Sequence, residues 1–138
     1  MKILVDTNVV LDLLLAREPF VQSAATIFAL TERSELESYL CATTVTTIDY
    51  LLSKVLEKSD AHAALQRLLE LFEIAPVNRP VIEEAIKSRI QDFEDAVIEQ
   101  AAYLVGAQAI VSRDTKGFKY SVVKCLDPQE LLAFLNVG

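Results

Sequence analysis

The chain opens with MKILVD, an apolar run that ends on a carboxylate, and this pattern limits the fold more than any other feature. A short, fully apolar run is typical of a strand that is buried on both faces, as in a parallel sheet. A helix-like segment follows at once, and the same order of apolar run and helical segment returns along the chain. Strands that alternate with helices predict an α/β fold.

The predicted elements give this fold more detail. Apolar runs predict five strands, at residues 2–6, 38–42, 73–77, 109–112 and 122–126. Apolar residues at helical spacing predict helices at residues 8–16, 20–33, 43–57, 59–72, 79–90, 92–107 and 127–135. Ser59 or Asp60 is expected to cap the fourth helix, and Pro80 lies in the first turn of the fifth. We predict a single Rossmann-like domain over residues 1–138, a three-layer α/β/α sandwich with a central, mostly parallel five-stranded sheet.

Composition supports a globular protein inside the cell. Of the 138 residues, 52% are hydrophobic and only three are glycine, which excludes a disordered or low-complexity chain. No apolar run approaches the roughly 20 residues of a membrane span, and the N-terminal run is too short for a signal peptide. Cys41 and Cys125 lie in apolar segments, so we expect reduced cysteines in a cytoplasmic protein.

The net charge of -7 is unusual for a protein that binds nucleic acid, because phosphate backbones attract Lys and Arg. The charge therefore leaves two alternatives. Either nucleic acid is not the ligand, or the acids surround a cation that reverses the local sign of the charge.

Two acids follow predicted strands. Asp6 ends the first strand, and it could simply cap the next helix, as could Thr7 or Asn8. Asp114 follows the fourth strand, where a turn beside Gly117 would also explain it. Each acid alone therefore has a structural explanation.

Two further acids lie in predicted helices. In DFEDAV, the acids Asp92, Asp95 and Glu99 share one stripe, although Asp92 could be a helix cap and Asp95 a favourable acid in the first turn. Asp49 lies within IDYLL, where a buried carboxylate is costly unless another group pairs with it.

The acids are more informative together. The carboxyl ends of parallel strands open on one edge of a sheet, where ligands bind. Asp6 and Asp114 belong to that edge, and we expect Asp49 and Asp95 early in their helices, so all four can converge on one crevice. Clustered carboxylates repel unless protonated or neutralised, and Mg²⁺ or Mn²⁺ suits an all-oxygen site. His62 is the only histidine, so zinc is not expected.

Such a site suggests a chemistry and a substrate. One or two divalent cations polarise a phosphodiester and lower the pKa of a bound water, which then attacks in line. The cations also answer the objection from net charge. Basic residues near the last acid would hold the remaining nucleic acid strand, and these are Arg113, Lys116, Lys119 and Lys124.

The same segments resemble the PIN-domain family, metal-dependent ribonucleases that include the VapC toxins. KILVDTNVVLDLLLAREPF is similar to the family's opening, including the R-x-P-F of one bacterial subgroup. DFEDAVIEQAAYLVGA followed by AIVSRDTKGF resembles the paired C-terminal motifs of that subgroup. The resemblance covers essentially the whole chain.

The resemblance implies a function and a set of site residues. It implies a PIN-like fold that cleaves single-stranded or structured RNA with one or two Mg²⁺ or Mn²⁺ ions, as the toxin of a type II toxin–antitoxin pair. A small antitoxin and a homodimer are implied as well. Asp6, Asp95 and Asp114 would line the metal site, supported by Asn8 and Ser112. Asp92 would lie just behind them.

The chain departs from the family in two places. The second family acid is usually Glu, and here Asp49 takes that place after Thr43, although related sequences often carry an acid where this chain has Thr47. Gly117 stands where the family often has Asp. Both departures bear on cation affinity and activity.

Three alternatives use the same features. An aspartyl phosphatase needs a second Asp at position 8, which is Asn8 here, and a receiver domain needs a pair of acids near the first strand. The third alternative is a catalytically weak or inactive PIN fold that binds RNA or a protein without cleaving it.

Overall fold

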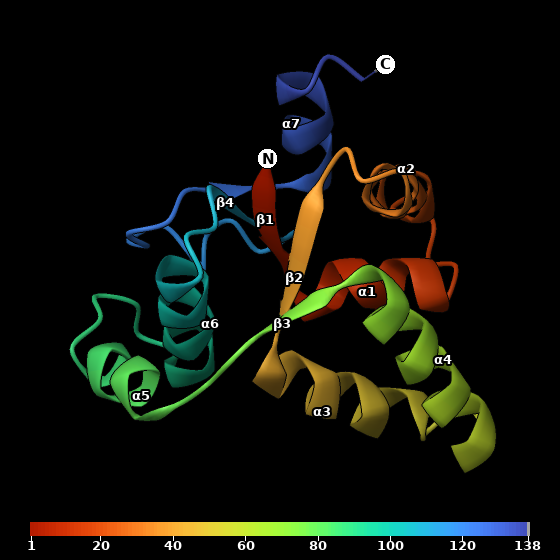
Figure 1. The fold of residues 1–138 in the computed structure, drawn as a ribbon, viewed down its shortest axis with the longest axis horizontal. Coiled ribbons are helices and arrows are strands. Elements are labelled where there is room, and N and C mark those ends of the chain that lie inside the picture. The colour runs from red at the N-terminus through yellow and green to blue at the C-terminus, as the bar shows by residue number, and fades with distance from the viewer. Residues whose placement is uncertain (138) are drawn as a thin grey trace.

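The structure, a computed structural model, describes residues 1–137 and shows a twisted sheet between two layers of helices (Figure 1). The strands are β1 (Lys2–Val5), β2 (Glu37–Cys41), β3 (Glu73–Ala75), β4 (Ala109–Val111) and β5 (Cys125–Leu126). They are ordered β3-β2-β1-β4-β5, and every neighbouring pair is parallel. The predicted α/β fold with a central five-stranded parallel sheet is confirmed.

Seven helices are found in the described residues. They are α1 (Thr7–Leu14), α2 (Val21–Glu32), α3 (Ala42–Leu52), α4 (Lys58–Leu71), α5 (Arg79–Ile86), α6 (Phe93–Leu104) and α7 (Pro128–Phe134). In Figure 1, α5 and α6 cover one face of the sheet, whereas α1 to α4 and α7 lie on the other side. Within residues 1–137, none of these helices has the length and apolar character needed to cross a membrane.

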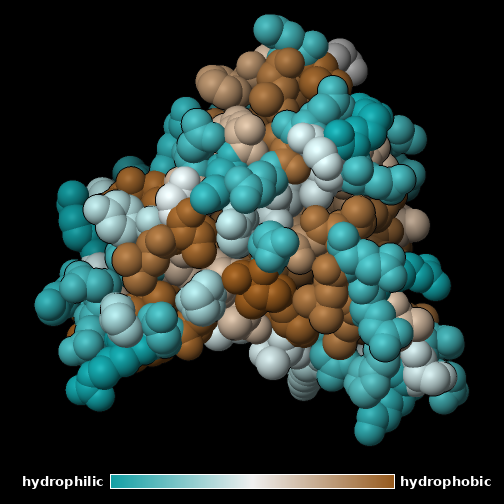
Figure 2. All heavy atoms as spheres, in the orientation of Figure 1, coloured by the Kyte–Doolittle hydropathy of each residue, from teal (hydrophilic) through white to brown (hydrophobic). Residues whose placement is uncertain are grey.

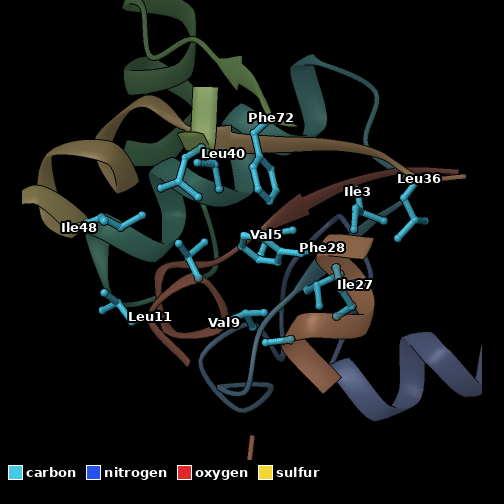
Figure 3. Close-up of a cluster of buried hydrophobic side chains, with 14 of the residues drawn as sticks. Ile3, Val5, Val9, Leu11, Ile27, Phe28, Leu36, Leu40, Ile48 and Phe72 are labelled. Carbon is cyan, nitrogen blue, oxygen red and sulfur yellow. The ribbon is translucent and has the colours of Figure 1, made fainter. Parts of the chain in front are cut away.

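Each face of the sheet has its own hydrophobic core, and this explains the uninterrupted apolar strands. Along β1, Ile3 and Val5 point into the core under α1 to α4 and α7, while Leu4 points into the core under α5 and α6. Figure 3 shows the first of these cores, in which the rings of Phe28 and Phe72 lie 5.1 Å apart. Side chains on both faces are buried, so both must be apolar.

Some boundaries differ from the predicted ones. The helix predicted over residues 43–57 ends at Leu52, because the residues that follow it are exposed and Val55 (65% exposed) has no core to pack against. The next helix is preceded by Glu57 rather than capped by Ser59 or Asp60. The fifth strand shortens to two residues, as it pairs only with β4 at the edge of the sheet.

The cysteines agree with the sequence interpretation. Cys41 is buried at the end of β2 and Cys125 is half-buried in β5, and both thiols are free.

Around the carboxyl ends of the strands, the surface in Figure 2 is hollowed between the part formed by α5 and α6 and the part formed by α3 and α4. The candidate site lies at this edge of the sheet.

Candidate active site

Pairing of β1 with β4 brings two of the predicted acids to the same edge. Val5 lies opposite Val111 in the parallel ladder, so Asp6 and Ser112 leave the sheet side by side. The N–H of Asp6 donates to the carbonyl of Val111 at 2.9 Å, which continues the ladder by one more bond. Asp114 follows two residues after Ser112. The sequence expectation that both acids occupy this edge therefore agrees with the structure.

Asp6 is a buried carboxylate, only 7% exposed. Its Oδ1 accepts the N–H of Thr7 at 2.8 Å, and its Oδ2 accepts the hydroxyl of Ser112 at 2.8 Å. Burial raises the pKa of Asp6, the two hydrogen bonds oppose that change, and the negative charge of Asp114 adds to it. Asp6 thus begins α1 as a helix cap and also faces a second acid.

Ser112 and Asn8 form a small network that holds the strand ends in place. The buried Ser112 hydroxyl oxygen accepts the N–H of Asp114 at 3.0 Å and the side-chain amide of Asn8 at 3.1 Å. The side-chain carbonyl of Asn8 accepts the N–H of Arg113 at 3.2 Å. Both predicted supporting residues therefore touch the segments that carry Asp6 and Asp114.

Asp95 and Asp114 meet around Gly117. The N–H of Gly117 donates to Oδ1 of Asp114 at 3.0 Å. A Cβ atom at position 117 would lie 2.5 Å from Oδ2 of Asp114 and 3.1 Å from Oδ2 of Asp95. Both carboxylate oxygens thus border the space that a glycine leaves open.

Crowding of negative charge is clearest at Asp95, the third residue of α6. Its pKa is raised to about 7, first by burial and then by the charges of Asp92, Asp6, Asp114 and Glu94. Asp92 caps the helix, because its Oδ1 accepts the N–H of Asp95 at 2.9 Å.

The donor groups fit a hard divalent cation. Within residues 1–137, no Lys, Arg or His forms an ion pair with Asp6, Asp95 or Asp114. In the same residues, no three His, Cys, Asp or Glu side chains are already drawn together as a metal-binding group. Instead the acids adjoin in pairs, Asp6 with Asp114 through Ser112 and Asp95 with Asp114 around Gly117. Unpaired carboxylate oxygens of this kind favour Mg²⁺ or Mn²⁺.

The structure does not bring Asp49 to these acids. The expectation that Asp49 lies early in its helix is wrong, because α3 begins at Ala42 and Asp49 is the eighth of its eleven residues. At 1.5 Å per residue, that places it about 10 Å along the helix from Ala42. Its Oδ1 lies 3.8 Å from Nε2 of His62 on α4, and its side chain is 40% exposed.

The residues of α3 nearest to the strand edge are threonines. Thr44 lies within hydrogen-bonding distance of Thr7, with 3.4 Å between their hydroxyl oxygens. Thr47 donates its hydroxyl to the carbonyl of Thr43 at 3.1 Å. Neutral hydroxyl groups therefore occupy the first turns of α3.

Sequence reasoning missed a buried ion-pair cluster next to the site. Asp12 is fully buried, and its carboxylate accepts two bonds from Arg113, from Nε at 2.7 Å and from a terminal guanidinium nitrogen at 3.1 Å. Nε of Arg17 lies 3.1 Å from the same carboxylate. The signal was the acid within the apolar run VVLDLLL, the same kind of signal that drew attention to Asp49.

Glu99 was also missed as a buried group. It was expected on an acidic stripe with Asp92 and Asp95, but it is only 1% exposed. Its carboxylate accepts the hydroxyl of Ser88 and, at 2.8 Å, the N–H of Val122. The hydrogen bond between Glu99 and Val122 therefore holds the loop before β5 against α6.

The predicted basic residues have different surroundings. Arg113 is held by Asp12 and lies over the ring of Phe20, with 3.9 Å from the guanidinium carbon to the ring centre. Lys116 and Lys119 are exposed in the loop that follows Asp114. Lys124 lies over the ring of Phe134, 5.1 Å from its centre.

Comparison with known proteins assigns the family. A sequence model described as a PIN domain matches residues 2–116. The chain belongs to the PIN-domain family. A curated member, Ribonuclease VapC1 of Aquifex aeolicus (strain VF5), is 25% identical over 134 residues, which cover 94% of this chain and 92% of the relative.

Solved PIN-domain structures share the fold. FitAcB from Neisseria gonorrhoeae superposes with a TM-score of 0.71 at 24% identity, covering 92% of this chain and 98% of that one. VapBC2 from Rickettsia felis, bound to a fragment of its promoter DNA, gives 0.70 at 17% identity, with 92% and 98% covered. At these identities the comparison supports the PIN-domain architecture and nothing finer.

The charge crowding at Asp95 has a consequence for stability. An acid whose pKa is higher in the folded state than in the unfolded chain lowers stability as pH rises from the unfolded value (3.8) to the folded value (about 7). In metal-free protein at pH 8, Asp95→Asn should therefore be more stable than wild type. With the shift discounted for partial exposure, we expect about 1 kcal/mol. Near pH 4 the two proteins should be equal, which urea unfolding at both pH values would measure.

A matched control variant separates this effect of Asp95 from a gain in stability that the removal of any acid in this helical turn would give. Glu94→Gln removes a neighbouring, exposed acid in the same helical turn and should change the free energy of unfolding much less. If Asp95→Asn were less stable than wild type at pH 8, the assignment of repulsion at Asp95 would be wrong.

Removal of Asp12, in contrast to removal of Asp95, should lower the stability of the protein. Asp12→Ala leaves two guanidinium groups without their shared carboxylate, so it should destabilise the protein by about 3 kcal/mol. The control is Glu35→Ala, which breaks the surface pair between Arg33 and Glu35 and should cost less than about 1 kcal/mol. Equal losses in chemical unfolding would contradict a structural role for Asp12.

Proposed function

We propose that this PIN-domain protein is a metal-dependent endoribonuclease that hydrolyses phosphodiester bonds of single-stranded or structured RNA. The observation that carries the proposal is the meeting of Asp95 and Asp114 around Gly117, beside the buried Asp6, with no cationic partner in residues 1–137. The curated relative named a ribonuclease supports the same reading.

Three acids would hold one or two Mg²⁺ or Mn²⁺ ions, namely Asp6, Asp95 and Asp114. A bound divalent ion supplies charge stabilisation at the scissile phosphate and lowers the pKa of water. Ser112 keeps Asp6 turned towards the site, and Asn8 keeps Ser112 in place. Asp92 fixes the first turn of α6, which carries Asp95. Asp49 lies late in α3, with its Oδ1 3.8 Å from Nε2 of His62, and is not needed to hold the ion.

The loop after β4 would contact the rest of the RNA. Lys116 and Lys119 are exposed within five residues of Asp114, and Arg113 directly precedes Asp114. These basic residues are therefore near Asp114 in sequence, although the protein as a whole is negative (-7). Such a local arrangement fits a substrate held by its phosphates near the ions.

A second candidate function has one observation in its favour. The first turns of α3 carry Thr43, Thr44 and Thr47, and Thr47 stands where related sequences often carry an acid. A site with three acids instead of four could bind a cation less tightly, so the chain could be a PIN fold that binds RNA or a protein partner without cleaving it.

Similarity to toxin–antitoxin complexes suggests the biological setting. One structural neighbour is described as a toxin–antitoxin complex from Klebsiella pneumoniae, and VapBC2 and FitAcB share the same fold. We therefore propose that the protein is a cytoplasmic type II toxin that forms a homodimer and is neutralised by a small antitoxin.

The nuclease proposal is tested by Asp6→Asn, which keeps the shape of the side chain but removes its charge. Wild type should cleave single-stranded RNA in Mg²⁺ or Mn²⁺ and stop when a chelator is added. The variant should lose more than about 100-fold in rate, because even partners of metal ligands cost 10–100-fold. Cleavage of a labelled oligonucleotide measures both rates.

Two further variants sharpen the result. Asp60→Asn removes an exposed acid from the first turn of α4 and serves as the matched control, with unchanged cleavage expected. Asp49→Asn should also retain cleavage, since Asp49 is the eighth residue of α3 and lies near His62 of α4. Equal residual activity in wild type and Asp6→Asn would instead favour the binding module.

The toxin proposal has an independent test. A small antitoxin gene is expected beside the gene for this chain, and its product should relieve the growth arrest caused by expressing the nuclease. Co-expression in a heterologous host measures this. If no such neighbour exists, the toxin role fails, whereas the nuclease proposal is unaffected.

A further inference from the structure

We propose that a pocket beside the acidic site, between the N-terminal ends of α2 and α7, holds one unpaired base of the RNA. The pocket has a volume of about 390 Å³, within the range of small-molecule sites. Pro19, Phe20 and Pro128 form its apolar walls, and Arg113, Asp127 and Gln129 supply polar groups. The inference rests on the proposed ribonuclease function but concerns residues other than the three acids.

The pocket adjoins the acidic site through the backbone. Arg113 lines the pocket, and its two chain neighbours, Ser112 and Asp114, belong to the acidic site. Consecutive Cα atoms are only about 3.8 Å apart. In Figure 1, α2 and α7 lie next to each other on the same side of the sheet, and their packing forms the outer wall. A nucleotide whose phosphate lies at the acids can therefore place a neighbouring base here.

The walls suit a flat aromatic ligand. The ring of Phe20 is 39% exposed, and the guanidinium of Arg113 is stacked over it. Bases of single-stranded RNA are recognised by stacking on aromatic rings and on arginine planes. The lining thus combines apolar groups, including two prolines, with polar ones, and a heterocyclic base has the same combination of an apolar face and a polar edge.

The guanidinium of Arg113 gives the pocket wall a group that attracts the phosphate of a nucleotide. One buried carboxylate, Asp12, is shared by Arg17 and Arg113, so one positive charge of this cluster is not neutralised within it. The side chain of Arg113 is 30% exposed, so its charge reaches the pocket. This charge attracts a phosphate, while the carboxylate of Asp127 in the same pocket offers an acceptor to the base.

The polar groups that line the pocket favour bases that carry an exocyclic amino group. Asp127 caps α7 through Oδ1, which accepts the N–H of Glu130 at 2.8 Å. No hydrogen bond within residues 1–137 uses its Oδ2, so that oxygen can accept from an amino group. Gln129 beside it offers both a donor and an acceptor. Adenine, cytosine and guanine fit this edge better than uracil.

A binding experiment tests the pocket without any cleavage. Metal-free protein is titrated with each nucleoside 5′-monophosphate while backbone amide NMR shifts are recorded. Shifts are expected at Phe20, Arg113 and Gln129, with the uridine nucleotide binding least tightly. No shifts there, or shifts there with arginine amide but not with nucleotides, would overturn the proposal and indicate a protein side chain as the ligand.

Variants with matched controls test the same pocket in cleavage. Phe20→Leu keeps an apolar side chain but loses the ring, so it should raise KM for RNA about tenfold with little change in kcat. The control is Phe134→Leu on α7, another exposed ring beneath a cation. Asp127→Asn keeps the helix cap, because Asn caps as well as Asp, and should weaken the preference against uracil. Its control is Asp60→Asn.

The two proposals fail in different ways. If wild type does not cleave RNA, the ribonuclease function fails, and the NMR titration still decides whether the pocket binds a base. If wild type cleaves RNA but Phe20→Leu has the same KM as Phe134→Leu, the pocket fails and the ribonuclease function stands.

Discussion

The parallel pairing of β1 with β4 is the contact on which the arrangement of the acids depends. Because Val5 lies opposite Val111, the residues after both strands leave the sheet at the same level. Ser112 can then join the carboxylate of Asp6 to the N–H of Asp114. A slip of one residue would turn every apolar side chain of β1 to the wrong core. The hydrophobic cores on the two faces therefore hold the acids in place as well.

The chain contains two different solutions to the cost of burying a carboxylate. Asp12 is fully buried, and two guanidinium groups neutralise it. Asp6 is nearly as buried but receives only neutral hydrogen bonds, and a second acid faces it, so its pKa rises. A charged group that the protein leaves without a counterion is one that an external cation stabilises when it binds. The contrast between the two acids supports the proposal that Asp6 binds a cation, whereas Asp12 has a structural role.

Much of the fold could be predicted because strand length, apolar character and the strand–helix alternation are local properties of the sequence. The places of Asp6 and Asp114 followed from the sheet edge. The different roles of Asp12 and Asp49 could not be predicted, since both are acids within apolar helical runs. Of the two partners of Asp12, Arg113 is 101 residues away in sequence, and the direction of Asp49 depends on α3 beginning at Ala42. Neither property can be read from neighbouring residues.

Gly117 is better explained by crowding than by a lost acid. A side chain at this position would meet the carboxylate of Asp114 at 2.5 Å from its first atom, so that carboxylate would have to turn away. Burial, together with the neighbouring acids, already raises the pKa of Asp95 to about 7, and a further carboxylate would add to the repulsion. Glycine keeps the oxygens of Asp95 and Asp114 facing one open space, and its N–H fixes Asp114 in that orientation. Because α3 has no acid in its first turn, the carboxylates of Asp6, Asp95 and Asp114 would supply all the acidic ligands of the proposed cation site, and their mutual orientation would matter correspondingly more.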